Sequence, residues 1–229
     1  MPRIPGVVVS LVSMLLLTGL SHADVADFFT PQQVGLDHYI APPLDAFTRA
    51  EIAAMLTIQD ARTPEQIARA LADSEYSVFR FADVMDPSFT ADKLPKAAAF
   101  FQRVHQTAAD VLEPIKRKWR RPRPFEQDER IKPALRPSPS PSYPSGHATF
   151  GYLVGVLLAV MVPERRDAIL ARAREYGENR VIGGVHFPSD VAAGREVAIV
   201  LAAELRSSAE FRDSFEEVRS EIRHVLRFE

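Results

Sequence analysis

The feature that most constrains the fold is a helical period of apolar residues that runs from Asp92 to Trp119. Steps of three and four positions place side chains on one face of an α-helix. The apolar positions that follow these steps are Leu94, Ala98, Phe101, Val104, Ala108, Val111, Ile115 and Trp119. The sequence therefore predicts a long helix here, with one face buried.

Two further segments are typical of helices. The sequence Thr-Pro-Glu-Gln at residues 63–66 has the form of a capping box with proline in the first helical position, and it predicts a helix to about Val84. Near the C-terminus, apolar residues recur with a helical period from Phe211 to Val225. This last stripe is a candidate interface between copies of the chain, although it suits the core equally well.

An apolar run from Thr149 to Val162 ends at Pro163 and is too short for a typical membrane span, which needs about 20 residues. It predicts a buried core helix. Because the alternating pattern typical of strands is absent, the sequence predicts an all-α fold, a single-domain helical bundle over residues 24–229.

The N-terminal residues have the pattern of a secretory signal peptide. Arg3 is the only charge before Asp24, an apolar run follows it, and Ser21-His22-Ala23 has the small-x-small form of a cleavage site. We expect residues 1–23 to be removed and the chain to be periplasmic or secreted, without stable membrane insertion after cleavage. A retained anchor and a buried N-terminal helix are the alternatives.

A proline-rich segment from Lys132 to Pro144 interrupts the helical pattern. It holds five prolines, which remove backbone donors and restrict the residues before them. Residues with potential chemistry lie on both sides of it, so we interpret it as a loop within one domain and not as a linker.

Positive charge is concentrated just before this loop. Six of the eight residues from Lys116 to Arg123 are basic. A solvated face or a nucleic-acid patch would explain such a run, although the net charge of −2 excludes a globally basic nucleic-acid binder. Lys116 and Arg123 are seven residues apart, close to two helical turns, so on a helix both would project from one face and suit an oxyanion.

Ser145, Gly146 and His147 come directly before the apolar run. The N-terminus of a helix offers unpaired N–H groups and the positive end of the dipole, which favour a phosphate. A simple helix cap would explain Ser and Gly equally well.

The third segment contains Arg180, His186 and Asp190. Arg180 suits a bidentate contact with two phosphate oxygens. Asp190 is placed to accept from one ring nitrogen of His186, which would leave the other nitrogen as a nucleophile or base. A structural His–Asp pair and a metal site are the alternatives. The chain has no cysteine and no further ligand cluster, so we expect neither a metal nor a cofactor.

In order, the three segments read Lys-x6-Arg-Pro, Pro-Ser-Gly-His and Arg-x5-His-x3-Asp. This order resembles the signature of the type 2 phosphatidic acid phosphatase and haloperoxidase superfamily. Within it, the chain resembles the bacterial class A non-specific acid phosphatases. The resemblance implies a helical bundle of the acid phosphatase and vanadium-dependent haloperoxidase type.

The resemblance also implies an activity, the hydrolysis of small phosphate monoesters, and roles for the matched residues. His186 would attack phosphorus, Asp190 would orient it, and His147 would protonate the leaving group and later help to activate water. The phosphate-binding residues that it implies are Lys116, Arg123, Ser145, Gly146 and Arg180. Transfer of the phosphoryl group to alcohols is an expected side activity, and we expect a bell-shaped pH profile with an acidic to near-neutral optimum.

Two departures from the family pattern stand out. Asn179 precedes Arg180 where the family usually has serine, and Gly183 lies where a cysteine would be expected. Three other functions remain open: a vanadate-dependent haloperoxidase, a lipid-phosphate phosphatase and a non-enzymatic nucleic-acid binder. We expect the phosphatase, with no nucleic-acid partner.

Residues outside the motifs are expected to have supporting roles. His38, His105 and His224 match no motif and are predicted to be structural. The remaining cations of the basic segment would steer anionic substrates through their long-range field. They are Arg117, Lys118, Arg120 and Arg121.

Overall fold

The computed structural model describes residues 28–228, so the predicted signal peptide at residues 1–23 lies outside the described residues. Within this range the regular structure is helical and contains no strand, which confirms the predicted all-α fold. The α-helices are α1 (Pro31–Val34), α2 (Asp45–Ala61), α3 (Pro64–Ala72), α4 (Ala82–Met85), α5 (Pro95–Trp119), α6 (Pro124–Gln127), α7 (Gly146–Met161), α8 (Arg166–Ile182), α9 (Pro188–Ser207) and α10 (Ala209–Val225). Three short 3₁₀ turns, η1 (Leu36–His38), η2 (Val78–Phe81) and η3 (Pro163–Arg165), complete the elements.

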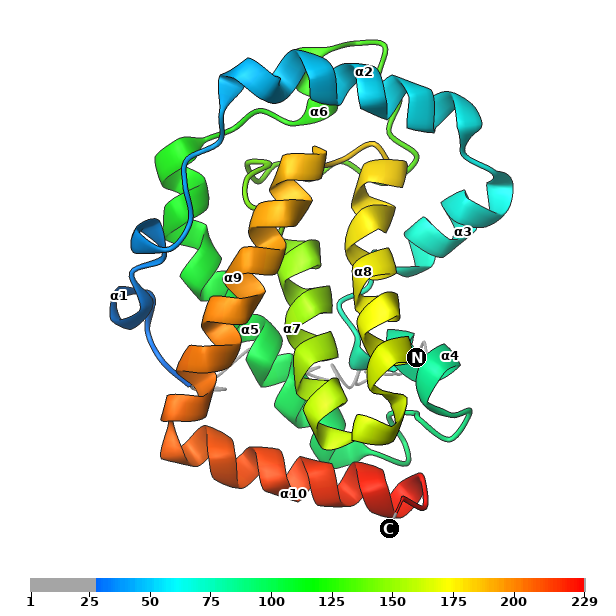
Figure 1. The fold of residues 1–229 in the computed structure, drawn as a ribbon, viewed down its shortest axis with the longest axis vertical. Coiled ribbons are helices and arrows are strands. Elements are labelled where there is room, and N and C mark those ends of the chain that lie inside the picture. Colours follow the sequence, from blue (N-terminus) through cyan, green and yellow to red (C-terminus); the bar gives the residue numbers. More distant parts are fainter. Residues whose placement is uncertain (1–27, 229) are drawn as a thin grey trace, which may run out of the picture.

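Helix α7 is the centre of the bundle, with α8 and α9 beside it and α5 behind (Figure 1). Its apolar run is continuous because neighbours cover it on several sides. Helix α8 packs closely against α7. A Cβ added to Gly155 of α7 would lie 2.4 Å from the Cβ of Ala173 of α8. Within the described residues, no helix combines the length and apolar character needed to cross a membrane.

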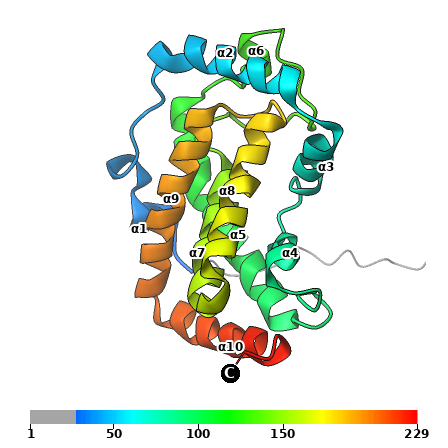
Figure 2. The same ribbon diagram turned by 45° about the vertical axis from the view of Figure 1, so that its right-hand side comes forward.

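Two helices cross the ends of the bundle. Helix α10 runs across one end and α2 across the other, an arrangement that is also visible after a 45° turn (Figure 2). The apolar stripe of α10 faces the core, where the ring of Phe211 lies 5.1 Å from that of Phe28 and 5.4 Å from that of Phe100. The stripe is therefore part of the core in the described structure.

The long predicted helix is present as α5, which begins at Pro95 and continues through Pro114. Arg120 ends it in the left-handed conformation, with φ of 45°. The proline-rich segment between α6 and α7 contains no helix, as predicted.

The helix predicted from Thr63 to Val84 is shorter than expected. Its capping box is present, with Thr63 Oγ1 accepting from the Gln66 N–H and Gln66 Oε1 accepting from the Thr63 N–H. However, α3 ends at Ala72 because the next side chain, Asp73, turns into the interior and bonds Asn179 and Arg172 of α8. The chain then forms a loop, Ser74–Ser77, before η2 and α4.

Candidate functional site

The three sequence motifs converge at the end of the bundle that α2 crosses (Figure 1). Helix α7 begins there, α8 ends there, and the α8–α9 loop and the first turn of α9 lie beside them. Residues far apart in sequence, such as Lys116 and His186, are thus close enough for the charge of one to act on the pKa of the other.

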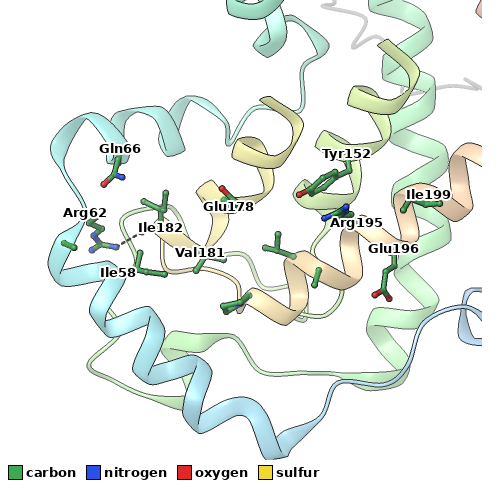
Figure 3. A pocket seen from close by; sticks show the side chains of 14 residues that line it. Ile58, Arg62, Gln66, Tyr152, Glu178, Val181, Ile182, Arg195, Glu196 and Ile199 are labelled. Carbon is green, nitrogen blue, oxygen red and sulfur yellow. Dashed lines mark hydrogen bonds between the residues drawn. The ribbon is translucent and has the colours of Figure 1, made fainter. Parts of the chain in front are cut away.

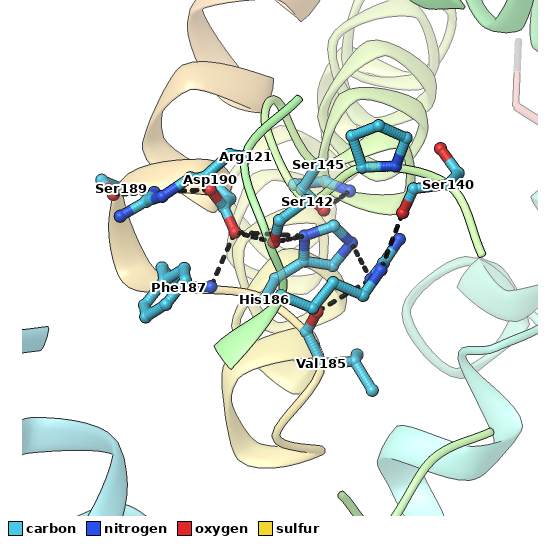
Figure 4. A network of polar contacts seen from close by, with 12 residues as sticks. Arg121, Ser140, Ser142, Ser145, Val185, His186, Phe187, Ser189 and Asp190 are labelled. Carbon is cyan, nitrogen blue, oxygen red and sulfur yellow. Dashed lines mark hydrogen bonds and ion pairs between the residues drawn. The ribbon is translucent and has the colours of Figure 1, made fainter. Parts of the chain in front are cut away.

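His186 and Asp190 lie within hydrogen-bonding reach of each other. His186 is in the α8–α9 loop, and its Nδ1 lies 3.3 Å from Oδ2 of Asp190 in the first turn of α9 (Figure 4). On the other side of the ring, Nε2 lies 3.3 Å from Nη1 of Arg123. A guanidinium group only donates hydrogen bonds, so the Nε2 that faces it carries a lone pair and the ring proton is on Nδ1, toward Asp190.

The charge state of His186 follows from its surroundings. Burial lowers the pKa of His186 to about 3, and the positive charges of Arg123 and Lys116 act in the same direction, against the effect of Asp190. The imidazole is therefore neutral at ordinary pH, with the lone pair of Nε2 directed toward Arg123. Such a nitrogen is able to act as a nucleophile.

Asp190 has no exposed surface, and several groups besides His186 bond its carboxylate. Its Oδ2 accepts from the Ser142 hydroxyl at 2.5 Å and from the Phe187 N–H at 2.8 Å, and its Oδ1 accepts from Arg121 at 2.6 Å. Burial alone would raise the pKa of Asp190, but the hydrogen bonds from His186 and Ser142 and the charge of Arg121 hold it below its ordinary value. The carboxylate stays ionised and fixes the ring.

Arg121 has a structural role that its sequence pattern did not indicate. It was expected to steer anionic substrates through its long-range field, and in the structure it is a buried residue that is 4% exposed. Its guanidinium bridges Asp190 to Glu51 of α2, with Nη2 2.7 Å from the glutamate Oε2, and lies 4.1 Å above the ring of Phe187. The spacing offers one signal, because Arg121 and Arg123 are two positions apart and both side chains are buried.

Ser142 and Glu51 also had no role in the sequence analysis. Ser142 lies in the proline-rich segment, and nothing in its spacing shows that its hydroxyl bonds Asp190. Glu51 is on α2, distant in sequence from every motif, and it also accepts from the Ser189 N–H at 2.7 Å. Only the folded chain brings α2 to this end of the bundle.

Lys116 and Arg123 face the same pocket, but not from one helical face as predicted. Helix α5 ends at Trp119, and Arg123 is the residue directly before α6, with an extended backbone. The proline-rich loop orients both cations: Pro141 O accepts from Lys116 Nζ at 2.7 Å, and Ser140 O accepts from Arg123 Nε at 2.9 Å. Burial, helped by the charge of Arg123, lowers the pKa of Lys116 to about 8.

Arg180 completes the group of buried cations. It lies on the last turns of α8 and is 5% exposed, and burial lowers its pKa to about 10. Ser74 Oγ accepts from its Nη1 at 3.1 Å, whereas its Nε is buried and has no hydrogen-bond partner among the described residues. A buried donor without an acceptor is costly and indicates a place for an anionic ligand.

The N-terminus of α7 faces these cations. Ser145 caps the helix, its Oγ accepting from the Ala148 N–H at 3.3 Å, and its own N–H donates to the Asp190 carbonyl oxygen at 3.0 Å. The N–H groups of Gly146 and His147 find no acceptor within residues 28–228. Helix α9 comes close at this point, since a Cβ on Gly194 would lie 2.7 Å from the Ser145 carbonyl oxygen.

His147 lies at the edge of this group. Its Nε2 is 3.1 Å from the Ser74 carbonyl oxygen, and its ring stacks on Tyr76 with centroids 3.9 Å apart. Burial, followed by the charge of Arg180, holds the pKa of His147 well below its ordinary value. In the free protein the ring is therefore neutral at ordinary pH.

Other cations of the basic segment are engaged elsewhere. Arg117 pairs with Glu113, and Lys118 pairs with Asp37. Within the described part of the chain, no group of three or more histidine or acidic side chains is arranged to hold a metal ion. The predicted site residues thus bring buried cations together around His186, beside the N-terminus of α7. We call this cluster the cationic pocket, and its charges suit a tetrahedral oxyanion.

A separate groove of about 890 Å³ lies between α2, α8 and α9 (Figure 3). Its walls include Ile58, Val181 and Ile199, with Arg62 and Arg195 among the charged residues. None of the eight predicted site residues lines it. The groove is therefore distinct from the cationic pocket.

Comparisons with known proteins identify a family and several relatives. Residues 104–213 match the model of the PAP2 superfamily. An acid phosphatase of Zymomonas mobilis is 36% identical over 57% of this chain and 51% of its own length. A non-specific acid phosphatase of Providencia stuartii is 31% identical over 70% of this chain and 68% of its own length. The chain thus spans about half the length of the first of these relatives and about two thirds of the second.

The fold has a counterpart among solved structures. A transmembrane PAP2 type phosphatidylglycerolphosphate phosphatase from Bacillus subtilis superposes on this chain with a TM-score of 0.53 at 17% identity. The match covers 79% of this chain and 96% of that chain. At this identity the likeness concerns the fold. Motifs, geometry and relatives together show that the chain belongs to the PAP2 superfamily, as a relative of the bacterial non-specific acid phosphatases.

Proposed function

We propose that the chain is an acid phosphatase that hydrolyses phosphate monoesters through a phosphohistidine on His186, without a metal ion. The observation that carries the proposal is the orientation of His186. Its Nδ1 is held toward Asp190 at 3.3 Å, and its Nε2 faces the buried cations. This is the geometry that a phosphoryl acceptor needs.

The phosphate of the substrate would occupy the space between the cations and the α7 N-terminus. Arg180 Nε and the N–H groups of Gly146 and His147 are the unpaired donors there, and Lys116 and Arg123 add positive charge. Fixed donors of this kind stabilise the charge on the equatorial oxygens of the transferred group.

In the first step, the lone pair of His186 Nε2 forms a bond to phosphorus while the bond from phosphorus to the ester oxygen breaks. The departing oxygen takes a proton from His147, and the phosphate stays on His186. The positive charge on the phosphorylated imidazole is balanced by the ionised Asp190.

In the second step, water attacks phosphorus and gives a proton to His147, and the phosphorus–nitrogen bond breaks. Orthophosphate then leaves, and both histidines return to their starting states. An alcohol in place of water would accept the phosphoryl group, which accounts for the expected transferase side activity.

His147 must be protonated to act as the acid, yet its pKa is low in the free protein. A bound phosphate dianion would supply negative charge beside Arg180 and favour the imidazolium form. We infer that His147 gains its proton together with the substrate.

The test is hydrolysis of p-nitrophenyl phosphate in the presence of EDTA by the wild-type protein, by His186→Ala and by His224→Ala as the matched control. We expect metal-independent turnover that His186→Ala loses by a factor of about 10⁴ or more and that His224→Ala retains. Turnover by His186→Ala at the wild-type rate would refute the assignment of the nucleophile.

We also propose that the protein is exported. The proposal rests on the sequence of residues 1–23, with its apolar run and the small residues before Asp24. N-terminal sequencing of the protein from the producing cell is expected to begin at Asp24. A protein that starts at Met1 would contradict it.

A further inference from the structure

Tyr76 is an aromatic residue beside the pocket that none of the motifs includes. It lies in the Ser74–Ser77 loop, and its ring is 4.1 Å from that of His105 and 3.9 Å from that of His147, with interplanar angles of 24° and 30°. Phe150 contacts it edge-on at 5.4 Å. His105 on α5 and His147 on α7 therefore fix the plane of the tyrosine ring.

The hydroxyl group of Tyr76 points to the beginning of α7. It would lie 3.2 Å from a Cβ placed on Gly146, so the space that glycine leaves open at this helix terminus is bordered by the tyrosine oxygen. Burial raises the pKa of Tyr76 to about 12, while the charges of Arg180 and Arg123 act in the opposite direction. The hydroxyl is thus neutral and lies in the field of two of the pocket cations.

This hydroxyl has no hydrogen-bond partner among the described residues, unlike those of two other tyrosines near the pocket. Tyr143 donates to the Ala41 carbonyl oxygen at 2.8 Å, and Tyr176 donates to the Glu75 carbonyl oxygen. Tyr76 is also 39% exposed, whereas Tyr143 and Tyr176 are buried, so its side chain is accessible to a ligand. The Arg180 Nε and the N–H groups of Gly146 and His147 are unpaired in the same region.

We propose that the Tyr76 hydroxyl is a further substrate-binding group, which donates a hydrogen bond to an oxygen of the bound phosphate ester. The inference rests on the proposed function of the same pocket. Since the ring stacks on His147, the proposed acid, the hydroxyl lies on the side from which the leaving group departs. Tyr76 then contributes to the affinity for every phosphate monoester and positions the ester beside His147.

The experiment compares the wild-type protein with Tyr76→Phe, which removes the hydroxyl and keeps the stacked ring. Tyr152→Phe is the matched control, because Tyr152 lies on α7 but lines the separate groove. Binding of inorganic phosphate is measured by calorimetry, and kcat and KM are measured with p-nitrophenyl phosphate. Phosphate binding does not require turnover, so the two measurements are independent.

We expect Tyr76→Phe to weaken phosphate binding and to raise KM by about tenfold, with kcat within about twofold, because a hydrogen bond to a charged group is lost in both ground and transition states. Tyr152→Phe is expected to match the wild type. Unchanged phosphate affinity in an active Tyr76→Phe would overturn this inference alone. Tighter binding would also overturn it, because the hydroxyl would then compete with the ligand. A folded wild-type protein that neither binds phosphate nor hydrolyses the ester would overturn the proposed function as well.

Discussion

Two aspartates among the described residues, Asp73 and Asp190, are completely buried, and the chain surrounds them differently. Asp73 accepts only from groups that keep their protons: Arg80, Arg172 and Asn179. Asp190 accepts from Arg121 and Ser142 as well, but one of its partners is the imidazole of His186. The two equally buried carboxylates therefore have different roles. Only Asp190 has a partner, His186, whose own charge is able to change.

The Asp73 cluster still matters to the pocket, although indirectly. It ends α3 and fixes the start of the Ser74–Ser77 loop against α8. That loop supplies the oxygen atoms of Ser74 that contact Arg180 and His147. Asp73 is in this sense a positioning residue, whereas Asp190 contacts the proposed nucleophile.

The largest expected effect is that of Asp190→Asn on turnover. The amide removes the negative charge that balances the imidazolium and favours the wrong ring tautomer, so we expect kcat to fall by about 10³- to 10⁴-fold. Steady-state kinetics with p-nitrophenyl phosphate measure it, and circular dichroism shows whether the variant is folded. A folded variant with more than a tenth of the wild-type kcat would place Asp190 in the same structural class as Asp73.

Asp73→Asn is expected to affect stability first. It leaves Arg172, whose side chain is 1% exposed, without its closest countercharge, and breaking a buried ion pair costs about 3–5 kcal/mol of unfolding free energy. Urea unfolding measures the loss, and kcat of the folded fraction is expected to stay within about tenfold of the wild type. A large loss of kcat at unchanged stability would remove the distinction between the two aspartates.

The pH dependence of turnover distinguishes the two aspartates further. The groups that bond Asp73 keep their protons, so we expect them to contribute nothing to the pH profile. His147 is faced by groups from several elements, which are Arg180, His186, His105, Tyr76 and the Ser74 carbonyl oxygen. The profile of kcat/KM reports the free protein, where the pKa of His147 is low, and that of kcat reports the complex, where phosphate favours the imidazolium. We expect the alkaline limb of kcat to lie about one pH unit above that of kcat/KM.

The acidic limb has a different origin. His186 loses its lone pair on protonation, and its pKa is lowered to about 3, so activity is expected to persist well below the ordinary histidine pKa and to fall only toward pH 3. Rates measured from about pH 3 to about pH 8 cover both limbs. If the alkaline limbs of kcat and kcat/KM coincided, bound substrate would not favour the protonated form of His147.

Asn179→Ser gives the smallest expected effect. Asn179 Nδ2 donates to Asp73 Oδ2 at 2.8 Å, and the shorter serine side chain loses this reach. We expect a loss of about 1 kcal/mol in unfolding free energy with kcat within about twofold, measured by urea unfolding and steady-state kinetics. A tenfold fall in kcat would show that Asn179 acts on the pocket directly and not through Asp73.

The parts of the fold that depend on local pattern could be predicted from the sequence. The apolar period predicted α5 and α10, and the capping box at Thr63 predicted the beginning of α3. The end of α3 was missed because it depends on Asp73 meeting Arg172, 99 residues away in the sequence. A tertiary contact of that kind leaves no periodic signal.

The same limit applies to the site. The motif residues converge as their order in the sequence suggested, but Lys116 and Arg123 do so from separate elements. Arg121 was grouped with the cations that steer substrates, because a run of basic residues does not show which member is buried. His105 was assigned a structural role, and its stacking on Tyr76 shows what it supports.

The hydrogen bond from the Ser145 N–H to the Asp190 carbonyl oxygen bears on how such a protein diversifies during evolution. Both atoms belong to the main chain, so no side-chain replacement other than proline at position 145 removes the bond. The turn that carries His147 and the turn that carries His186 are thereby inherited as one unit. The Ser74–Ser77 loop is attached to it through side chains and the Ser74 carbonyl oxygen, so new substrate preferences are expected to arise in this loop first, while the nucleophile and the acid keep their places.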